Sequence, residues 1–215
     1  MTPQSPFLAL PLEVRYAIYS QLCSTEPISY PWKWSPVSSI DLRPPPLALQ
    51  LSCRSLFSEI QSYYYGRATL RFVNPAKQPL FSGQHRLACG KAIRLTKKIE
   101  IMLIWNVTKE QANSDHRSWS MHSFLPGIVE LLEEEGENIG LVILSVKDAS
   151  DKEVSWSFKK RLLAPLAELA PTVTFTLGEV TAADEEEGGL KQHLQGYVDE
   201  LNARSRDAGE GSKEG

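Results

Sequence analysis

The chain has 215 residues, of which 42% are hydrophobic and 23% are charged, and its formal net charge at pH 7 is -3. This composition is typical of a folded globular protein and excludes disorder throughout. The slightly negative charge argues against nucleic acid as a partner, because binding to phosphate backbones needs a basic surface. No stretch approaches the roughly 18 consecutive apolar residues that a membrane span requires, so we expect no membrane partner.

The three cysteines lie about thirty or more residues apart, without a CxxC pair or histidines at zinc-finger spacing. We therefore expect no metal, no cofactor and a reducing environment. Together with the absence of a signal-peptide pattern, this predicts a cytoplasmic or nuclear location.

The first predicted element is a helix from Pro11 to about Cys23, because proline at the first helical position loses no hydrogen bond. Residues 1–6 before it are expected to be flexible. Residues 24–46 hold six of the 14 prolines, so they are expected to form a loop inserted between two helices.

A second helix is expected from Leu47 to about Gly66, because apolar residues recur there at helical spacing. The residues that carry this spacing are Leu49, Cys53, Leu56, Phe57, Ile60 and Tyr64. "ATLRFV", residues 68–73, then alternates like a strand.

The rest of the chain alternates between strand and helix patterns. Strands are expected at 98–105, 140–146 and 172–177, and amphipathic helices follow each of them, the last at 190–201. Such alternation predicts parallel strands joined by right-handed helical crossovers. The fold class is therefore α+β or α/β. The spacing of the strands also resembles a short leucine-rich-repeat-like array, but no LxxLxL consensus accompanies it, so we expect a small sheet with helical crossovers. Residues 203–215 are expected to be a disordered tail, because they offer no large apolar side chain.

We find no convincing enzyme motif, so we expect a protein without catalytic residues. Ser157 and Lys160 match the SxxK pattern by chance, because the partner motifs are missing. His116 and His122, with Asp115 nearby, are six residues apart, which is not the spacing of two ligands on one helix face.

Two segments carry a resemblance to a known family. "FLALPLEVRYAIYSQL" resembles the Leu-Pro-x-Glu-Val-Arg-x-x-Ile-Tyr-x-x-Leu opening of the large fungal family of F-box-like proteins. "LALQLSCRSLFSEIQSYYYGRATLRF" is similar to the second element of that family, with its Cys-Arg, its Glu and its tyrosine-rich helix end. The resemblance implies an F-box-like helical module over residues 7–72, with the proline-rich insertion at 24–46. The alternation of strands and helices predicts that an α/β domain follows at 73–202.

The first helix has two apolar stripes. Leu10, Val14, Ile18 and Leu22 form one, and Leu12, Tyr16, Tyr19 and Cys23 form the other. One stripe can pack on the second helix. The resemblance implies that the Leu-Pro start and its apolar neighbours contact a Skp-type adaptor protein, so the candidate partner face consists of Leu10, Pro11, Leu12, Tyr16 and Tyr19. The alternative is that the chain itself buries both stripes.

Two further groups of residues are candidates for contacts. Each of the first two helices supplies an arginine and a glutamate, so we expect crossed pairs between Glu13 and Arg54 and between Arg15 and Glu59 as a structural lock. In the proline-rich loop, Tyr30, Trp32 and Trp34 form a possible partner contact, because alternate residues of an extended chain share a face. The alternative is that this loop closes the chain's own core.

The resemblance implies a function without chemistry. The chain is expected to be a substrate-recognition adaptor of a cullin-RING (SCF-type) ubiquitin ligase, in which the N-terminal module docks on the Skp-type protein and residues from about 90 onward capture a protein substrate. The alternative is an interaction or scaffold protein that keeps the helices only as a structural module.

Overall fold

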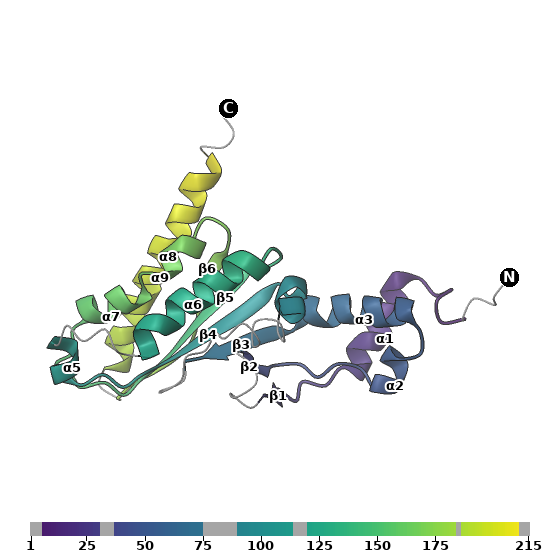
Figure 1. Cartoon of the computed structure of the whole chain (residues 1–215), viewed down its shortest axis with the longest axis horizontal. Helices are drawn as coiled ribbons and strands as arrows, with labels where there is room; N and C mark the ends of the chain where they lie inside the picture. Colours follow the sequence, from purple (N-terminus) through teal and green to yellow (C-terminus); the bar gives the residue numbers. More distant parts are fainter. Residues whose placement is uncertain (1–5, 31–36, 75–89, 114–119, 184–185, 211–215) are drawn as a thin grey trace.

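The structure, a computed structural model, describes residues 6–30, 37–74, 90–113, 120–183 and 186–210. It contains helices and one six-stranded mixed sheet, which confirms an α+β architecture (Figure 1). The helices are α1 (Leu12–Leu22), α2 (Leu47–Gln50), α3 (Arg54–Arg67), α5 (Lys109–Asn113), α6 (Ser120–Glu135), α7 (Trp156–Leu163), α8 (Leu166–Leu169) and α9 (Glu187–Glu210). The strands are β1 (Ile28–Ser29), β2 (Val37–Ile40), β3 (Thr69–Val73), β4 (Lys98–Trp105), β5 (Leu141–Asp148) and β6 (Thr174–Thr181).

The strands follow one another across the sheet in chain order, from β1 to β6. The neighbours β1, β2 and β3 are antiparallel, whereas β3 to β6 are parallel. Parallel neighbours need a long crossover, and α6 supplies it between β4 and β5, as α7 and α8 do between β5 and β6. The sheet therefore continues across residue 73, where the sequence predicts a boundary between two units.

The proline-rich insertion, which the sequence predicts to be a loop, contains two short strands. Strand β2 pairs with β3, so that Ile40 lies opposite Leu70 and Val37 opposite Phe72. Both Val37 and Ile40 are buried. Such short strands are stabilised by pairing with a neighbouring strand, which is a tertiary contact that local sequence patterns do not reveal.

The second predicted helix is interrupted, because α2 ends at Gln50 and α3 begins at Arg54. Cys53 lies between them in an extended conformation, and its Sγ accepts a hydrogen bond from the backbone N–H of Leu56 at 3.5 Å. It is therefore the N-cap of α3, a position at which the backbone leaves the helix although the side-chain spacing continues.

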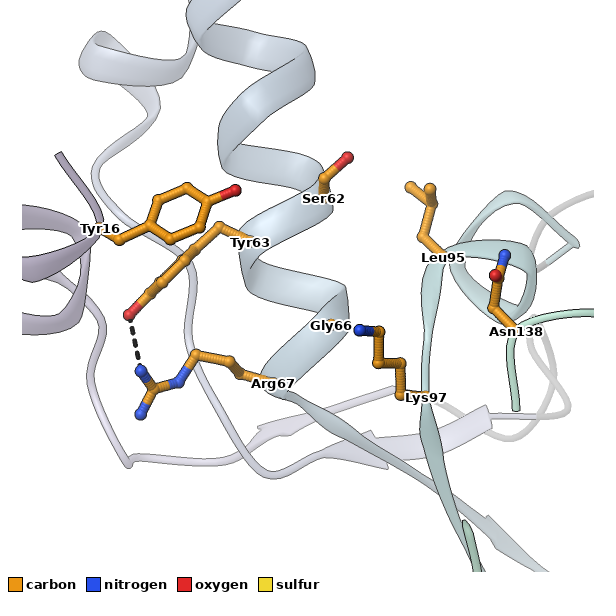
Figure 2. Close-up of a pocket in the computed structure, with 8 residues that line it drawn as sticks. All are labelled: Tyr16, Ser62, Tyr63, Gly66, Arg67, Leu95, Lys97 and Asn138. Atoms are coloured by element: carbon orange, nitrogen blue, oxygen red, sulfur yellow. Dashed lines mark hydrogen bonds between the residues drawn. The ribbon is translucent and has the colours of Figure 1, made fainter. Parts of the chain in front are cut away.

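We call the helices α1, α2 and α3 the helical unit. Helix α3 joins this unit to the sheet, because it leads through Ala68 directly into β3 (Figures 1 and 2). The Tyr64 hydroxyl donates a hydrogen bond of 2.6 Å to the carbonyl of Leu42, beside β2. The buried Thr96 hydroxyl, just before β4, donates to the carbonyl of Tyr65 at 3.0 Å. These contacts hold the end of α3 against the sheet.

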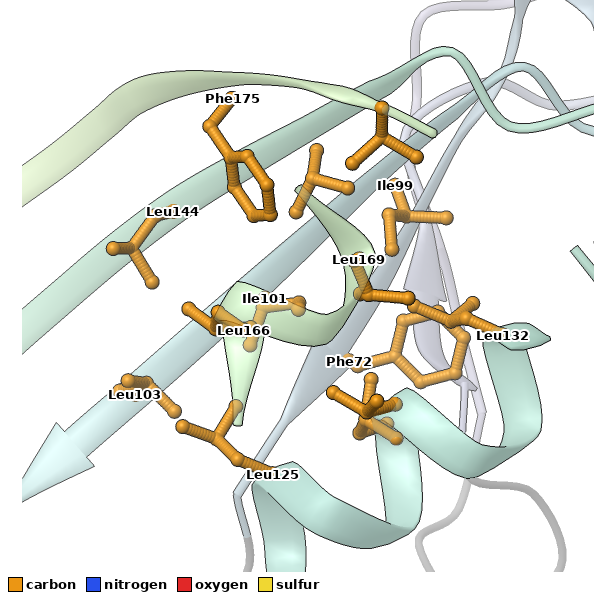
Figure 3. Packing of buried hydrophobic residues seen from close by; sticks show 14 of the residues in the cluster. Phe72, Ile99, Ile101, Leu103, Leu125, Leu132, Leu144, Leu166, Leu169 and Phe175 are labelled. Atoms are coloured by element: carbon orange, nitrogen blue, oxygen red, sulfur yellow. The ribbon is translucent and has the colours of Figure 1, made fainter. Parts of the chain in front are cut away.

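The main core lies between one face of the sheet and the helices that cover it. Figure 3 shows Phe72, Ile99, Ile101, Leu103, Leu144 and Phe175 from the strands, with Leu125 and Leu132 of α6 and Leu166 and Leu169 of α8. All are buried. Burying an aliphatic or aromatic side chain of this size contributes about 1.5–3 kcal/mol, so this layer dominates the stability of the fold.

The opposite face of the sheet carries a polar network centred on Glu100. Its carboxylate accepts hydrogen bonds of 2.7 Å from both Arg71 Nε and Ser145 Oγ. Ser145 Oγ in turn accepts from the backbone N–H of Glu179 at 3.0 Å. A Cβ on Gly178 would lie 2.3 Å from Ser145 Oγ, so only glycine allows β6 to approach this closely.

The C-terminal segment departs from the expectations in two places. Strand β6 spans Thr174–Thr181 rather than 172–177, and α9 continues to Glu210, where the sequence predicts disorder from 203 onward. Extending an existing helix needs no new nucleus, and alanine and arginine favour it, so a polar segment can remain helical. Asn202 of α9 binds the free edge of β6, because its side-chain amide accepts from the N–H of Phe175 at 2.8 Å and donates to its carbonyl at 2.9 Å.

Candidate partner-binding surface

The helical unit at the N-terminal end has a small core of its own. Tyr19 of α1 and Leu56, Ile60 and Tyr63 of α3 are buried together. The Tyr16 ring packs at 4.8 Å from that of Tyr63, and the Tyr19 ring at 5.5 Å. Cys23 and Leu49 pack on the same core from the end of α1 and from α2. These contacts fix which face of α1 is turned inward.

A charged network lies at the edge of this core. Arg15 donates from Nε and from Nη2 to the two carboxylate oxygens of Glu59, at 2.8 Å each. The Tyr19 hydroxyl donates to the same carboxylate at 2.9 Å. Arg15 Nη1 also donates to the carbonyls of Leu8 and Leu10. One guanidinium therefore joins α1, α3 and the segment before Pro11.

The contacts in this network shift the pKa values of Glu59 and Tyr19 in opposite directions. The hydrogen bonds from Arg15 lower the pKa of the Glu59 carboxyl below its ordinary value. Burial raises the pKa of the Tyr19 hydroxyl, and the hydrogen bond to Glu59 acts in the same direction. Glu59 is therefore an ionised acceptor and Tyr19 a neutral donor, which is the arrangement of a structural contact and not of a proton-transfer pair.

Of the two expected crossed pairs, the structure contains the contact between Arg15 and Glu59. Glu13 and Arg54, both described and both exposed, form no ion pair with each other. Glu13 lies in the first turn of α1 and Arg54 begins α3. Of the two ion pairs expected in the structural lock, only the one between Arg15 and Glu59 is therefore formed.

The residues expected to form the partner face differ in exposure. Leu10, Pro11 and Leu12 are exposed. Tyr16 is half-buried against Tyr63. Tyr19 is fully buried, so it is wrong as a partner contact and belongs to the core of the helical unit. The stripe that contains Tyr16, Tyr19 and Cys23 is the one that faces α3.

Leu10, Val14 and Leu22 of the other stripe therefore remain exposed, and so does Leu12 at the start of α1. Leu47 of α2 and Leu51, which directly follows α2, are exposed as well. We define the α1–α2 surface by the exposed apolar residues Leu10 (36%), Leu12 (41%), Val14 (44%), Leu22 (39%), Leu47 (64%) and Leu51 (67%). Sequence reasoning missed Val14, Leu22, Leu47 and Leu51 as contact residues. For Val14 and Leu22 the signal was present in the stripe that also contains Leu10, but only the packing decides which stripe is covered.

Other predicted candidates contribute less. Tyr30 is exposed, and its backbone N–H donates to the carbonyl of Ser38 at 2.8 Å. Trp32, Trp34, Asp115 and His116 lie outside the described residues, and His122 falls within α6. The Lys160 ammonium binds both carboxylate oxygens of Glu200, at 2.9 and 2.7 Å, so it pairs across to α9.

Within the described ranges, no group of three or more His, Cys, Asp or Glu side chains is arranged to hold a metal ion. In the same ranges, no helix combines the length and the apolar character needed to cross a membrane.

Comparisons with known proteins give no relative for this chain. No protein-family model matches it, no curated protein matches it and no solved structure matches it.

Proposed function

We propose that this chain is an F-box-like substrate-recognition adaptor of a cullin-RING (SCF-type) ubiquitin ligase. In this proposal the α1–α2 surface binds a Skp-type adaptor protein, and the part of the chain from about residue 90 onward binds a protein substrate. The chain performs no chemistry itself. It raises the effective concentration of a substrate lysine near the ubiquitin-conjugating enzyme by holding both in one complex.

The observation that carries this proposal is the exposure of the α1–α2 surface. Its residues belong to the two segments that resemble the F-box-like family, and six large apolar side chains remain uncovered there in the described part of the chain. A concentration of exposed apolar residues on one small unit is typical of a protein-binding surface. We also propose that the helices are F-box-like and that the remaining sheet is leucine-rich-repeat-like.

Calorimetric titration with a purified Skp-type adaptor tests the proposal. We expect binding at micromolar concentration, with Leu12→Ser and Leu47→Ser each weakening it more than about fivefold, as for central contact residues. Ile104→Ser is the matched control, because Ile104 is an exposed apolar residue as well, at 42%, but lies on β4. All three variants should unfold at the wild-type temperature. Absence of binding by the folded wild-type chain would refute the proposal.

A second function is favoured by how the helices are joined to the sheet. Ser24, just after α1, forms a bridge with Arg43, and the insertion supplies strands β1 and β2. This arrangement supports a scaffold protein in which the helices are an integral part of the fold. The double variant Leu10→Ser, Pro11→Ala separates the two functions: the ligase proposal expects a folded protein without adaptor binding, and the scaffold proposal expects a loss of stability first.

A further inference from the structure

An open hollow lies at the junction between the helical unit and the sheet (Figure 2). Its volume is about 540 Å³, which is in the range of ligand sites. Its lining includes Tyr16 of α1, Tyr63, Gly66 and Arg67 of α3, and Lys97 and Asn138 near the amino ends of β4 and β5. Four segments that are distant in the sequence therefore form one concave site.

The charge in this hollow is positive and without a counter-charge. None of the described residues that line it is acidic. Arg67 and Lys97 form no salt bridge with any carboxylate in the described ranges. Arg67 Nη1 donates to the Tyr63 hydroxyl at 3.0 Å, and its guanidinium carbon lies 5.4 Å from the centre of the Tyr63 ring. The guanidinium is thus held in place, and its remaining donors are available to an anion.

The two cations do not converge on one point. In Figure 2, Arg67 points toward the Tyr63 hydroxyl, whereas Lys97 points toward Gly66 from the side of the sheet. A Cβ built on Gly66 meets no atom within 4 Å, so the space next to this glycine is open. Because the two cations come from different elements and point in different directions, an extended chain that carries several carboxylates fits this layout.

We propose that this hollow binds an extended acidic segment of a partner protein. Its carboxylates pair with Arg67 and Lys97, and its backbone passes over Gly66. This site is separate from the α1–α2 surface and does not depend on the proposed adaptor function. The whole chain has a net charge of -3, so its net charge repels an acidic peptide. Binding of such a peptide therefore requires a local positive site.

The first test is fluorescence anisotropy with labelled octaglutamate at low ionic strength, with octaglutamine as the uncharged probe. We expect octaglutamate alone to bind, and Arg67→Ala and Lys97→Ala to weaken it about threefold each, the effect of an exposed ion pair. Arg54→Ala and Lys191→Ala are the matched controls, since both residues are exposed and lie outside the hollow. Equal weakening by the controls would overturn the proposal.

The second test uses a substitution that places a larger side chain in the hollow. Gly66→Leu introduces a side chain into open space and replaces a helical glycine by a better helix former, so the variant should be at least as stable as the wild type. We expect it to weaken octaglutamate binding about tenfold or more. Unchanged binding by Gly66→Leu, or no binding by the wild type, would overturn the proposal. Binding of inorganic phosphate but not octaglutamate, sensitive to the same variants, would also overturn it by assigning a small-anion site.

Discussion

Arg15 of α1 and Glu59 of α3 are 44 residues apart in the chain and form two hydrogen bonds of 2.8 Å. Their side chains are 13% and 15% exposed. The Arg15 guanidinium also binds the carbonyls of Leu8 and Leu10. The pair therefore fixes both the angle of α1 on α3 and the conformation of the segment before Pro11, which presents part of the α1–α2 surface.

We expect Glu59→Gln to lower the melting temperature at neutral pH by a few degrees, because Arg15 and Tyr19 lose an ionised acceptor. The folded-state pKa of Glu59 lies below its ordinary value of 4.5. Its stabilising contribution is therefore present above that value and is lost as pH falls through the folded-state pKa. In thermal unfolding, the difference in melting temperature between Glu59→Gln and the wild type should become smaller below pH 4.5. Glu13→Gln should have a smaller effect, because it loses only the interaction of an exposed carboxylate with the N-terminus of α1. A difference that stays constant into acid contradicts the role of the charge.

The contact of Asn202 with β6 predicts that an amide in the middle of α9 stabilises the sheet. Asn202→Ala removes both hydrogen bonds to the backbone of Phe175, and we expect it to lower the free energy of unfolding by about 1–2 kcal/mol. Gln192→Ala, on an exposed position of the same helix, should change it little. Denaturant titration measures both. An equal effect of the two substitutions would show that the edge contact carries no stability.

Two glycines should respond in opposite ways to the same substitution. Gly178→Ala places a Cβ 2.3 Å from Ser145 Oγ, which is held by Glu100 and by the N–H of Glu179, so we expect a loss of about 1–3 kcal/mol. Gly196→Ala in α9 meets no atom within 4 Å and should stabilise the helix by up to about 1 kcal/mol. Chemical denaturation of both variants gives the comparison. Stability that does not change in Gly178→Ala would show that the approach of β6 to β5 is not tight.

The sequence predicts the strongly apolar elements well. The runs at 98–105 and 140–146 are strands because such runs fit strands that are largely buried. It does not predict β1 and β2, whose pairing depends on β3, nor the break at Cys53, where a cap interrupts a continuing apolar spacing. On α1 both stripes are apolar, so composition alone cannot decide which one faces α3. The contact between Asn202 and β6 cannot be predicted either, because no local sequence pattern distinguishes this amide from other polar residues of the helix.

Hydrogen–deuterium exchange, measured for the full chain alone and with a purified Skp-type adaptor at micromolar concentration, tests the role of the α1–α2 surface most directly. Backbone amides exchange more slowly where a partner excludes water or suppresses local opening. We expect protection in residues 7–22 and 47–51 and none in β4 or β5. Protection confined to the sheet, or no protection anywhere in a folded chain, would contradict the account.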